Sequence, residues 1–289
     1  MPQPTYQAAI DFGISNTDIV ARIGAEWRMW TAPYTGHPDA GQVRTLLAQG
    51  NVALEQLAWL GVSGGRHRLL PAQLGNCTVV SIGELEAIGR GGQIIAERAK
   101  PEQAHTIREQ PILVVSAGSG TAMVAAQGER YSHVTGTAVG GGTLLGLGRL
   151  LLNTIDPQEI NRLAEAGNAN GVDLSLADVI TGPIGALPAA ATAVNFGRLA
   201  RENVPSRRED LAAALVTLIG QTIALVAINA AKAQQTDTIV VTGHMTDMAT
   251  IRHMLAAVGR LYGMSLHMPT DGGYATALGA LAIAERQMN

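Results

Sequence analysis

The sequence of 289 residues predicts an α/β protein with two halves, in each of which a mixed sheet is flanked by helices. Apolar runs of strand length alternate with segments of helical periodicity along the chain. A strand, a glycine turn and a second strand occur near residue 11, and the same pattern restarts near residue 117. The 34 glycines gather in clusters, which is typical of tight turns that bring the backbone close to a ligand. We place the boundary near residue 105, so that the halves comprise residues 1–105 and 106–289.

The individual elements follow from the same patterns in chain order. A strand–turn–strand unit at 8–20 precedes a strand at 26–31 that has the alternation of a hairpin. Further strands are predicted at 60–63, 78–82, 111–117, 121–127, 130–136 and 236–243. Helices are predicted within 43–58 and at 84–98, 144–152, 157–167, 207–232, 249–261 and 272–285. We expect the helix at 84–98 to be interrupted or weakened at Gly89, Gly91 and Gly92.

The composition excludes several classes of protein. Hydrophobic residues make up 47% of the chain and charged residues 15%, which indicates a compact globular protein rather than a disordered one. A net charge of -3 provides no polyanion-binding surface, so we expect no nucleic-acid partner. The single cysteine, Cys77, excludes an intrachain disulfide and a thiolate metal cluster. It suits a reducing compartment, so we expect a cytoplasmic protein.

We expect no association with a membrane. Residues 1–13 lack a basic region followed by a long apolar run, so the sequence predicts no signal peptide. The longest apolar stretch, 211–231, is rich in alanine and contains the polar residues Thr217, Gln221, Thr222 and Asn229. These groups would be costly in lipid, so a buried amphipathic helix fits better than a membrane span.

The first candidate site is the turn after the first strand. Its residues are Asp11, Gly13, Ser15, Asn16 and Thr17. Backbone N–H groups and hydroxyls in such a turn can bond phosphate oxygens, and Asp11 at the strand end can hold Mg²⁺ through water. A hairpin turn without a ligand is the alternative interpretation.

The second candidate site is the turn that follows the strand at 111–117. It contains Gly118, Ser119, Gly120 and Thr121, and it offers N–H groups and hydroxyls at the end of a sheet. One GSGT sequence is weak evidence for phosphate binding. Two such turns in one chain favour a two-sided phosphate clamp.

The third candidate site is the glycine-rich segment from Gly136 to Gly148. Its predicted binding residues are Gly136, Thr137, Gly140, Gly141 and Gly142. Successive glycines that open a helix leave unpaired N–H groups and no Cβ in the way, so an anion or a substrate can dock there. The segment is apolar beyond Thr143, which argues against a flexible linker.

The fourth candidate site combines a strand end with the start of the last helix. Gly243 and His244 follow the strand at 236–243, while Gly272 and Gly273 open the helix at 272–285. Small residues on both sides would leave a flat slot for an adenine ring. Close packing of a helix on a sheet through small residues is the alternative interpretation.

Together these motifs resemble the type II (eukaryotic-like) pantothenate kinases, the fumble family of the acetate kinase/sugar kinase/Hsp70/actin superfamily. GERYSHVTGTAVGGGTLLGLGRLLL is similar to the central block of that family, GSGTAMV to its second phosphate motif, and NFGRL at 195–199 to its NFG motif. GELEAIGRGG and TGH followed by GGYATALGALAI resemble its acidic helix start and its adenosine motif. The resemblance spans nearly the whole chain. It implies a duplicated ribonuclease H-like (actin-like ATPase) fold with ATP and Mg²⁺ bound between two lobes, and a homodimer.

Three positions depart from the family pattern. Asp18 stands where the first loop of the family ends in a phosphate-binding lysine. The stretch RHRLLPAQL after Gly65 offers no carboxylate, although the family carries a catalytic glutamate there. His133 replaces an arginine that contacts substrate in the family. Since hydroxyl phosphorylation needs a base and positive charge near the transferred phosphate, the resemblance supports ATP binding but secures no kinase base.

Other residues are candidates for these roles. We expect Asp11 to act as a metal anchor and catalytic residue, and Glu84 or Glu86 as the base. Candidates for phosphate or substrate contacts are Arg66, His67, Arg68 and His133. These residues also have an interpretation that involves no ligand. Glu84 would then only stabilise the first turn of its helix, and the arginines would be solvated charges of a loop.

The resulting prediction is an ATP-dependent small-molecule kinase of coenzyme A biosynthesis. By resemblance, the acceptor is the hydroxyl of pantothenate or a related cofactor precursor. A divergent member with another acceptor or with ATPase activity is one alternative. A non-catalytic protein that binds nucleotide or another protein is the second.

Overall fold

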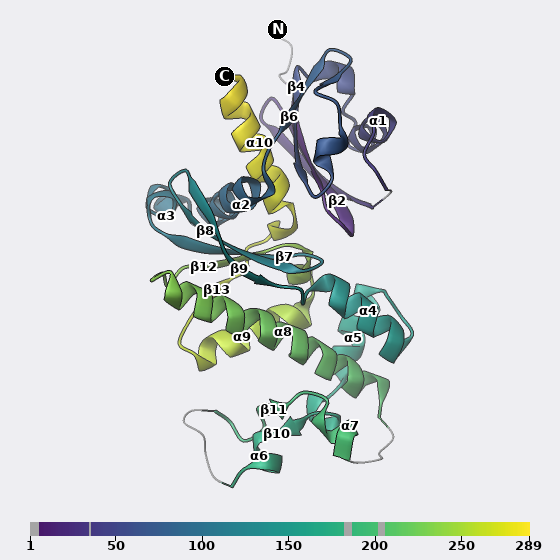
Figure 1. Ribbon diagram of the computed structural model, residues 1–289, viewed down its shortest axis with the longest axis vertical. Coiled ribbons are helices and arrows are strands. Elements are labelled where there is room, and N and C mark those ends of the chain that lie inside the picture. The colour runs from purple at the N-terminus through teal and green to yellow at the C-terminus, as the bar shows by residue number, and fades with distance from the viewer. Residues whose placement is uncertain (1–5, 35, 182–186, 202–205) are drawn as a thin grey trace.

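The computed structural model describes residues 6–34, 36–181, 187–201 and 206–289. Two main sheets lie one above the other, with helices between and around them (Figure 1). The first sheet has the order β3-β2-β1-β4-β6-β5. Its strands are β1 (Tyr6–Phe12), β2 (Asn16–Ile23), β3 (Glu26–Pro33), β4 (Trp59–Gly64), β5 (Gln73–Leu74) and β6 (Cys77–Ser81).

The second sheet repeats this topology without a counterpart of β5, which pairs antiparallel to β6. Its order is β13-β12-β7-β8-β9, from β7 (Ile112–Ala117), β8 (Thr121–Gln127), β9 (Arg130–Thr137), β12 (Ile239–Thr242) and β13 (Leu266–His267). In both sheets three antiparallel strands in chain order are followed by two strands that add in parallel. The predicted α/β fold with a repeated strand–turn–strand unit is therefore confirmed.

Helices cover both sheets. Figure 1 shows α2 (Glu84–Ala99) and α10 (Ala275–Met288) between them, with α1 (Ala40–Gln49) beside the first sheet. The second sheet is covered by α8 (Arg208–Ala233) and α9 (Ala249–Leu261). The remaining helices are α3 (Ala104–Glu109), α4 (Gly141–Leu152), α5 (Pro157–Ala166), α6 (Leu176–Val179) and α7 (Gly197–Arg201), and a small hairpin pairs β10 (Leu174–Ser175) with β11 (Thr192–Val194).

The prediction that glycines interrupt the helix at 84–98 is wrong. The α2 helix is continuous, and its glycines are the points of closest packing. A Cβ at Gly89 would overlap the ring of Tyr131, one at Gly91 the carbonyl of Ala275, and one at Gly92 the side chain of Val114. The intrinsic cost of glycine in a helix is thus offset by contacts that any larger residue would prevent.

A helix is present in the predicted range 43–58, but it begins before that range. It runs from Ala40 to Gln49, and a short 3-10 turn (Leu54–Gln56) follows. Gly50 lies beneath the ring of Trp30, and Asn51 adopts a left-handed conformation with φ 55°. That conformation ends a helix, because left-handed geometry cannot continue it.

The long apolar stretch forms α8. By length and composition this helix could cross a membrane. However, 61% of its most apolar stretch of 18 residues is buried inside the fold. Leu215, Ile219 and Ile223 are fully buried, and they belong to the core that α8 forms with the second sheet. The helix therefore behaves as a core element of the fold, as the sequence predicted.

Candidate nucleotide site between the two sheets

A cavity of about 500 Å³ opens between the ends of the two sheets. Both strand–turn–strand units contribute to it, through the β1–β2 turn and the β7–β8 turn. The described residues that line it are Asp11, Gly13, Ile14, Ser15, Asn16, Asp18, Glu84, Ile88, Ser116, Gly118, Ser119, Gly120, Thr121, Ala122, Thr137, Gly141, Leu144, Leu145, Pro157, Gly243, His244, Met245, Met248, Gly273 and Thr276. A site of this size, with mixed polar and apolar walls, suits a small molecule.

The first wall of the cavity is the β1–β2 turn. Gly13 must be a glycine, because a Cβ there would lie 2.6 Å from the carbonyl oxygen of Asn16. Antiparallel pairing then sets Asp11 of β1 directly opposite Asp18 of β2. Paired positions in an antiparallel sheet point to the same face, so both carboxylates face the cavity.

The second wall is the β7–β8 turn together with the start of α4. The N–H of Gly141 donates to the carbonyl of Gly118 over 2.8 Å, and the N–H of Gly142 donates to that of Ser119 over 2.9 Å. The expectation that these two N–H groups are unpaired is therefore wrong. Helix α4 can approach the turn so closely because Gly140 has no side chain. A Cβ there would lie 2.7 Å from the carbonyl oxygen of Ser119.

The two walls touch at one point. The hydroxyls of Ser15 and Ser119 lie 2.7 Å apart, so each phosphate-type turn contacts the other directly. Both side chains are at the exposed mouth of the cavity. A ligand that uses both turns must displace or bridge this hydrogen bond.

Three carboxylates meet on the first-sheet side of the cavity. Burial, and after it the negative charges of Asp18 and Glu84, raise the pKa of Asp11 to about 8, although the nearby His244 acts in the opposite direction. Asp11 is therefore mostly protonated at neutral pH in the empty protein. A cation beside it would favour its ionised form.

His244 connects these carboxylates to the second-sheet side. Its Nε2 lies 2.8 Å from Oδ1 of Asp18, and its Nδ1 lies 2.6 Å from Oδ2 of Asp247. Burial lowers its pKa, but the hydrogen bonds and charges of Asp18 and Asp247 outweigh that effect and raise the pKa to about 10. The ring is thus an imidazolium at neutral pH, and no lysine or arginine is among the described residues that line the cavity.

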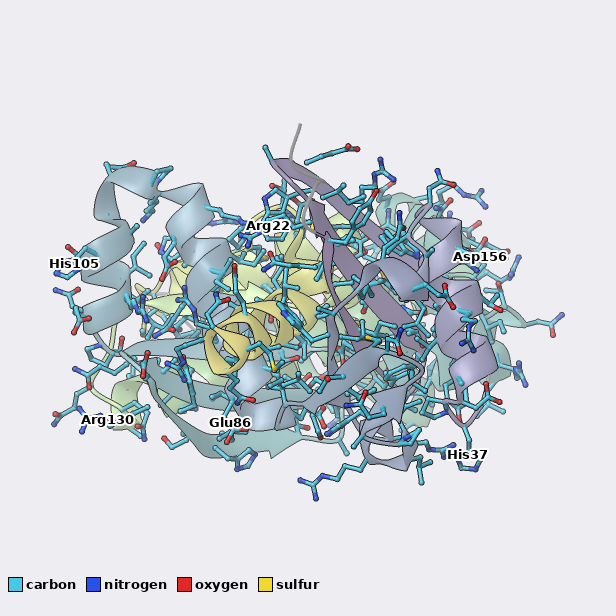
Figure 2. All side chains as sticks on the ribbon, turned by 90° about the horizontal axis from the view of Figure 1, so that it is seen from above. Arg22, His37, Glu86, His105, Arg130 and Asp156 are labelled. Atoms are coloured by element: carbon cyan, nitrogen blue, oxygen red, sulfur yellow. The ribbon has the colours of Figure 1, made fainter. Side chains whose placement is uncertain are left out.

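Several predicted site residues lie away from the cavity wall. Thr17 is buried beneath the first turn, and Gly272 accepts a hydrogen bond from the N–H of Gly243. Gly136, Gly140 and Gly142 support the second wall without lining the cavity, and His133 is exposed on β9. Arg66 stacks over the ring of Tyr34 at 5.5 Å and contacts its hydroxyl, and Glu86 is exposed (Figure 2).

One part of the cavity wall is not predicted by the sequence motifs. Leu144, Leu145, Met245 and Met248 form an apolar side, together with Ile88 and Pro157. A helical pattern could have placed Leu144 and Leu145 in the core but not at a ligand. Asp18 was noted only as a departure from a family pattern, although its position opposite Asp11 follows from the hairpin register.

Similarity to known proteins shows to which family the chain belongs. Residues 76–283, well over half of the chain, match the family described as Fumble. The chain belongs to the Fumble family. The type II pantothenate kinase of Bacillus cereus (strain ATCC 14579) is 26% identical over 227 residues, which cover 78% of this chain and 81% of that protein. The type II pantothenate kinase of Oceanobacillus iheyensis is 29% identical over 229 residues, covering 79% of this chain and 83% of the relative.

Solved structures share the fold. Component A of the (R)-2-hydroxyglutaryl-CoA dehydratase of Acidaminococcus fermentans matches with a TM-score of 0.60 at 16% identity, over 98% of both chains. The ROK hexokinase of Thermus thermophilus matches with a TM-score of 0.56 at 15% identity, over 98% of this chain and 100% of its own. These similarities confirm the actin-like ATPase fold that the sequence predicted, with mixed sheets flanked by helices.

The residues of this Fumble-family chain fit a magnesium ion held through water and phosphate. Among the described residues, no group of three or more His, Cys, Asp and Glu side chains is arranged to hold a metal directly. Mg²⁺ commonly keeps several waters and is bound by one or two carboxylates and the phosphates of its substrate. The pKa of Asp11 is raised first by burial and then by the charges of Asp18 and Glu84, and a cation beside the carboxylate would offset both effects.

Proposed function

We propose that the protein is an ATP-dependent small-molecule kinase that phosphorylates the hydroxyl of pantothenate or of a related cofactor precursor. The observation that carries this proposal is the cavity walled by two glycine–hydroxyl turns, one from each sheet, with Asp11 and Glu84 on one side. Relatives named type II pantothenate kinase match most of the chain, which supports the acceptor. A solved activator with the same fold contains bound ADPNP, which supports ATP as the donor.

The two turns would bind the phosphates. Ser15 and Asn16 of the first turn and Ser119 and Thr121 of the second present hydroxyl and amide groups to the same cavity. The glycines of both turns allow the backbone to approach an anion closely. Gly243 and Gly273, on the opposite side, would accommodate the nucleoside.

Asp11 and Glu84 would have different roles. Asp11 lies at the end of β1, and we assign it to hold Mg²⁺ through water, which supplies positive charge to the phosphates. Glu84 opens α2 at the edge of the same cavity and is exposed, so it can reach an acceptor hydroxyl that enters from solvent. We therefore assign Glu84 as the base that takes the hydroxyl proton.

A coupled ADP-release assay tests the function. Purified protein with Mg·ATP should release ADP when pantothenate is added and much less without it. ADP release that is independent of pantothenate would favour an ATPase or another acceptor. Binding of Mg·ATP without turnover would favour a non-catalytic nucleotide-binding protein, an outcome for which the lack of lysine and arginine among the described lining residues gives a physical reason.

The organisation of the whole molecule completes the proposal. We propose that residues 1–105 and 106–289 act as two lobes around the nucleotide, in a homodimer that works in the cytoplasm without nucleic-acid or membrane partners. The repeated sheet topology supports two lobes. Light scattering coupled to gel filtration measures the oligomeric state, and a mass near 30.1 kDa would contradict a dimer.

A further inference from the structure

His244 spans the gap between the two sides of the cavity. It belongs to the 3-10 turn His244–Asp247 that follows β12 of the second sheet. Its Nε2 contacts Asp18, which belongs to β2 of the first sheet. Asp18 is also held from β3, since the hydroxyl of Thr31 donates to the same carboxylate oxygen over 2.7 Å.

The geometry requires both ring nitrogens to donate. Nδ1 faces a carboxylate oxygen of Asp247, and Nε2 faces one of Asp18. A neutral imidazole has one N–H and could satisfy only one of these acceptors, whereas an imidazolium has two. Charge-assisted hydrogen bonds of this kind are about twice as strong as neutral ones.

The surroundings keep the ring in this orientation. The ring lies against the backbone of Gly273, where a Cβ would overlap it, and the edge of Tyr274 meets it at a centroid distance of 5.8 Å. The side chain of Asp18 is only 9% exposed and that of His244 is 27% exposed. The pair is therefore shielded from solvent far more than an ordinary surface ion pair.

We propose that His244 is a positioning residue that ties the strand end of the second sheet to β2, and so sets the width of the cavity in which the nucleotide binds. The inference rests on the proposed nucleotide site but names a residue that the binding turns do not include. Through the same contact His244 offsets the charge of Asp18, which would otherwise repel phosphate at a wall that already holds Asp11 and Glu84.

The neutral contact between Ser15 and Ser119 could not replace this link. It is a single hydrogen bond between exposed hydroxyls at the mouth of the cavity. The His244 link is charged on both sides and lies deeper in the protein. Removing His244 would leave the buried carboxylate of Asp18 with Thr31 as its remaining side-chain donor among the described residues, which costs more than the loss of a neutral bond.

Three variants distinguish a specific link between His244 and Asp18 from a general effect of charge on nucleotide binding. His244→Gln cannot donate to both carboxylates in the ring geometry. Asp247→Asn weakens only the contact within the turn and leaves the link to Asp18 in place. His105→Gln is the matched control, because His105 is exposed on α3 and points away from the molecule (Figure 2).

Calorimetry with Mg·ATP is the first measurement. We expect His244→Gln to weaken binding about tenfold or more, since hydrogen bonds to charged groups contribute about 1.5–3 kcal/mol. Asp247→Asn should weaken it clearly less, and His105→Gln should not change it. In the Asp18→Asn background, His244→Gln should cost much less than it does alone, which reports the coupling of the two residues. An affinity of His244→Gln within twofold of the wild type, or an equal loss in Asp247→Asn, would overturn the proposal.

Amide hydrogen exchange tests the link between His244 and Asp18 independently of the proposed kinase activity. In the protein without nucleotide, His244→Gln should speed amide exchange both in the turn 244–247 and in β2, whereas His105→Gln should change neither. Wild-type protein that fails to bind Mg·ATP would refute the proposed function and leave the link testable by exchange alone. Unchanged exchange in β2 would refute the link whether or not the protein binds ATP. Should His244→Gln fail to fold, Asp18→Asn is measured in its place, because it keeps the size of the side chain.

Discussion

Replacing Asp11 by Asn should make the empty protein more stable and abolish its response to Mg·ATP. Asp11 has a pKa of about 8 in place of an ordinary 3.8, mainly because it is buried beside two other carboxylates. At about 1.36 kcal/mol for each pH unit, this difference bounds the cost of ionising Asp11 in the folded protein at roughly 6 kcal/mol. Because linkage ties this cost to the pKa, we expect a gain of up to roughly 6 kcal/mol in the free energy of unfolding above pH 8, and a smaller gain would go with a correspondingly narrower pH window.

The sign of the pH dependence follows from the direction of the pKa change. The folded protein binds the Asp11 proton more tightly than the unfolded chain does, so this group destabilises the fold increasingly as the pH rises from about 4 to about 8. The Asn variant lacks the titrating group. Its advantage over the wild type should be small at pH 5 and should reach its full size above pH 8.

Thermal unfolding from pH 5 to pH 9, with and without Mg·ATP, is the assay. For a chain of 289 residues, each kcal/mol corresponds to a rise in Tm of about 2 °C, so the variant should melt several degrees above the wild type at high pH. Saturating Mg·ATP should raise the Tm of the wild type through mass action but leave that of the variant unchanged. The exposed Asp237→Asn is the control. Superimposable curves for wild type and Asp11→Asn at every pH would refute the reasoning, as would a variant that still responds to Mg·ATP.

Two further substitutions test the base and the packing of α2. Glu84→Gln should lower kcat by roughly 10²–10⁴-fold with little change in Mg·ATP affinity, since general-base catalysis contributes about that much. Glu86→Gln, in the same helical turn but outside the cavity, is its control in the ADP-release assay, and equal losses would refute the assignment. Gly91→Ala should lower the free energy of unfolding by about 1–3 kcal/mol in urea, because the added methyl group overlaps the carbonyl of Ala275. An unchanged midpoint would show that α2 and α10 can move apart freely.

Local patterns sufficed to predict most of the longer elements and the two glycine turns of the site. The apolar strands ending at Asp11 and Ala117, each followed by a glycine turn, predicted two turns at sheet ends, and both line the cavity. The partners of these turns could not be predicted in the same way. His244 meets Asp18 across 226 positions of sequence, and nothing near either residue indicates the other.

The glycines illustrate the same limit of prediction from the sequence. Consecutive glycines at the start of α4 were expected to leave N–H groups free for an anion, whereas those groups bond the carbonyls of Gly118 and Ser119. A glycine that admits a ligand and a glycine that admits another part of the backbone look alike in a sequence. Only the position of the neighbouring segment distinguishes them, and that depends on the tertiary fold.

The duplication of the fold extends to two glycines that serve the same purpose. Gly64 ends β4 with φ +90° against the carbonyl of Phe12, and Gly243 follows β12 with φ +91° against the carbonyl of Ala117. Each glycine allows its parallel strand to lie close to the end of the first strand of the same sheet, and Gly243 also lines the cavity. Alanine at either site would meet both a backbone conformation that L-residues avoid and an overlap with a carbonyl.

We therefore expect Gly64→Ala and Gly243→Ala to destabilise the protein to a similar extent. A backbone with φ near +90° costs about 1–3 kcal/mol for a residue with a Cβ. Overpacking adds about 1–3 kcal/mol, so that each variant should lose roughly 3 kcal/mol in urea unfolding. Gly65→Ala is the control, since nothing lies within 4 Å of its added Cβ. The two halves differ at the next step, because only Gly243 is followed by a residue that crosses to the other sheet, His244. Gly243→Ala should thus also weaken Mg·ATP binding through the displaced ring of His244. Gly64→Ala should weaken it through Asp11, because its added Cβ would lie 2.6 Å from Oδ1 of that carboxylate. Unchanged Mg·ATP affinity in Gly243→Ala would contradict the link through His244.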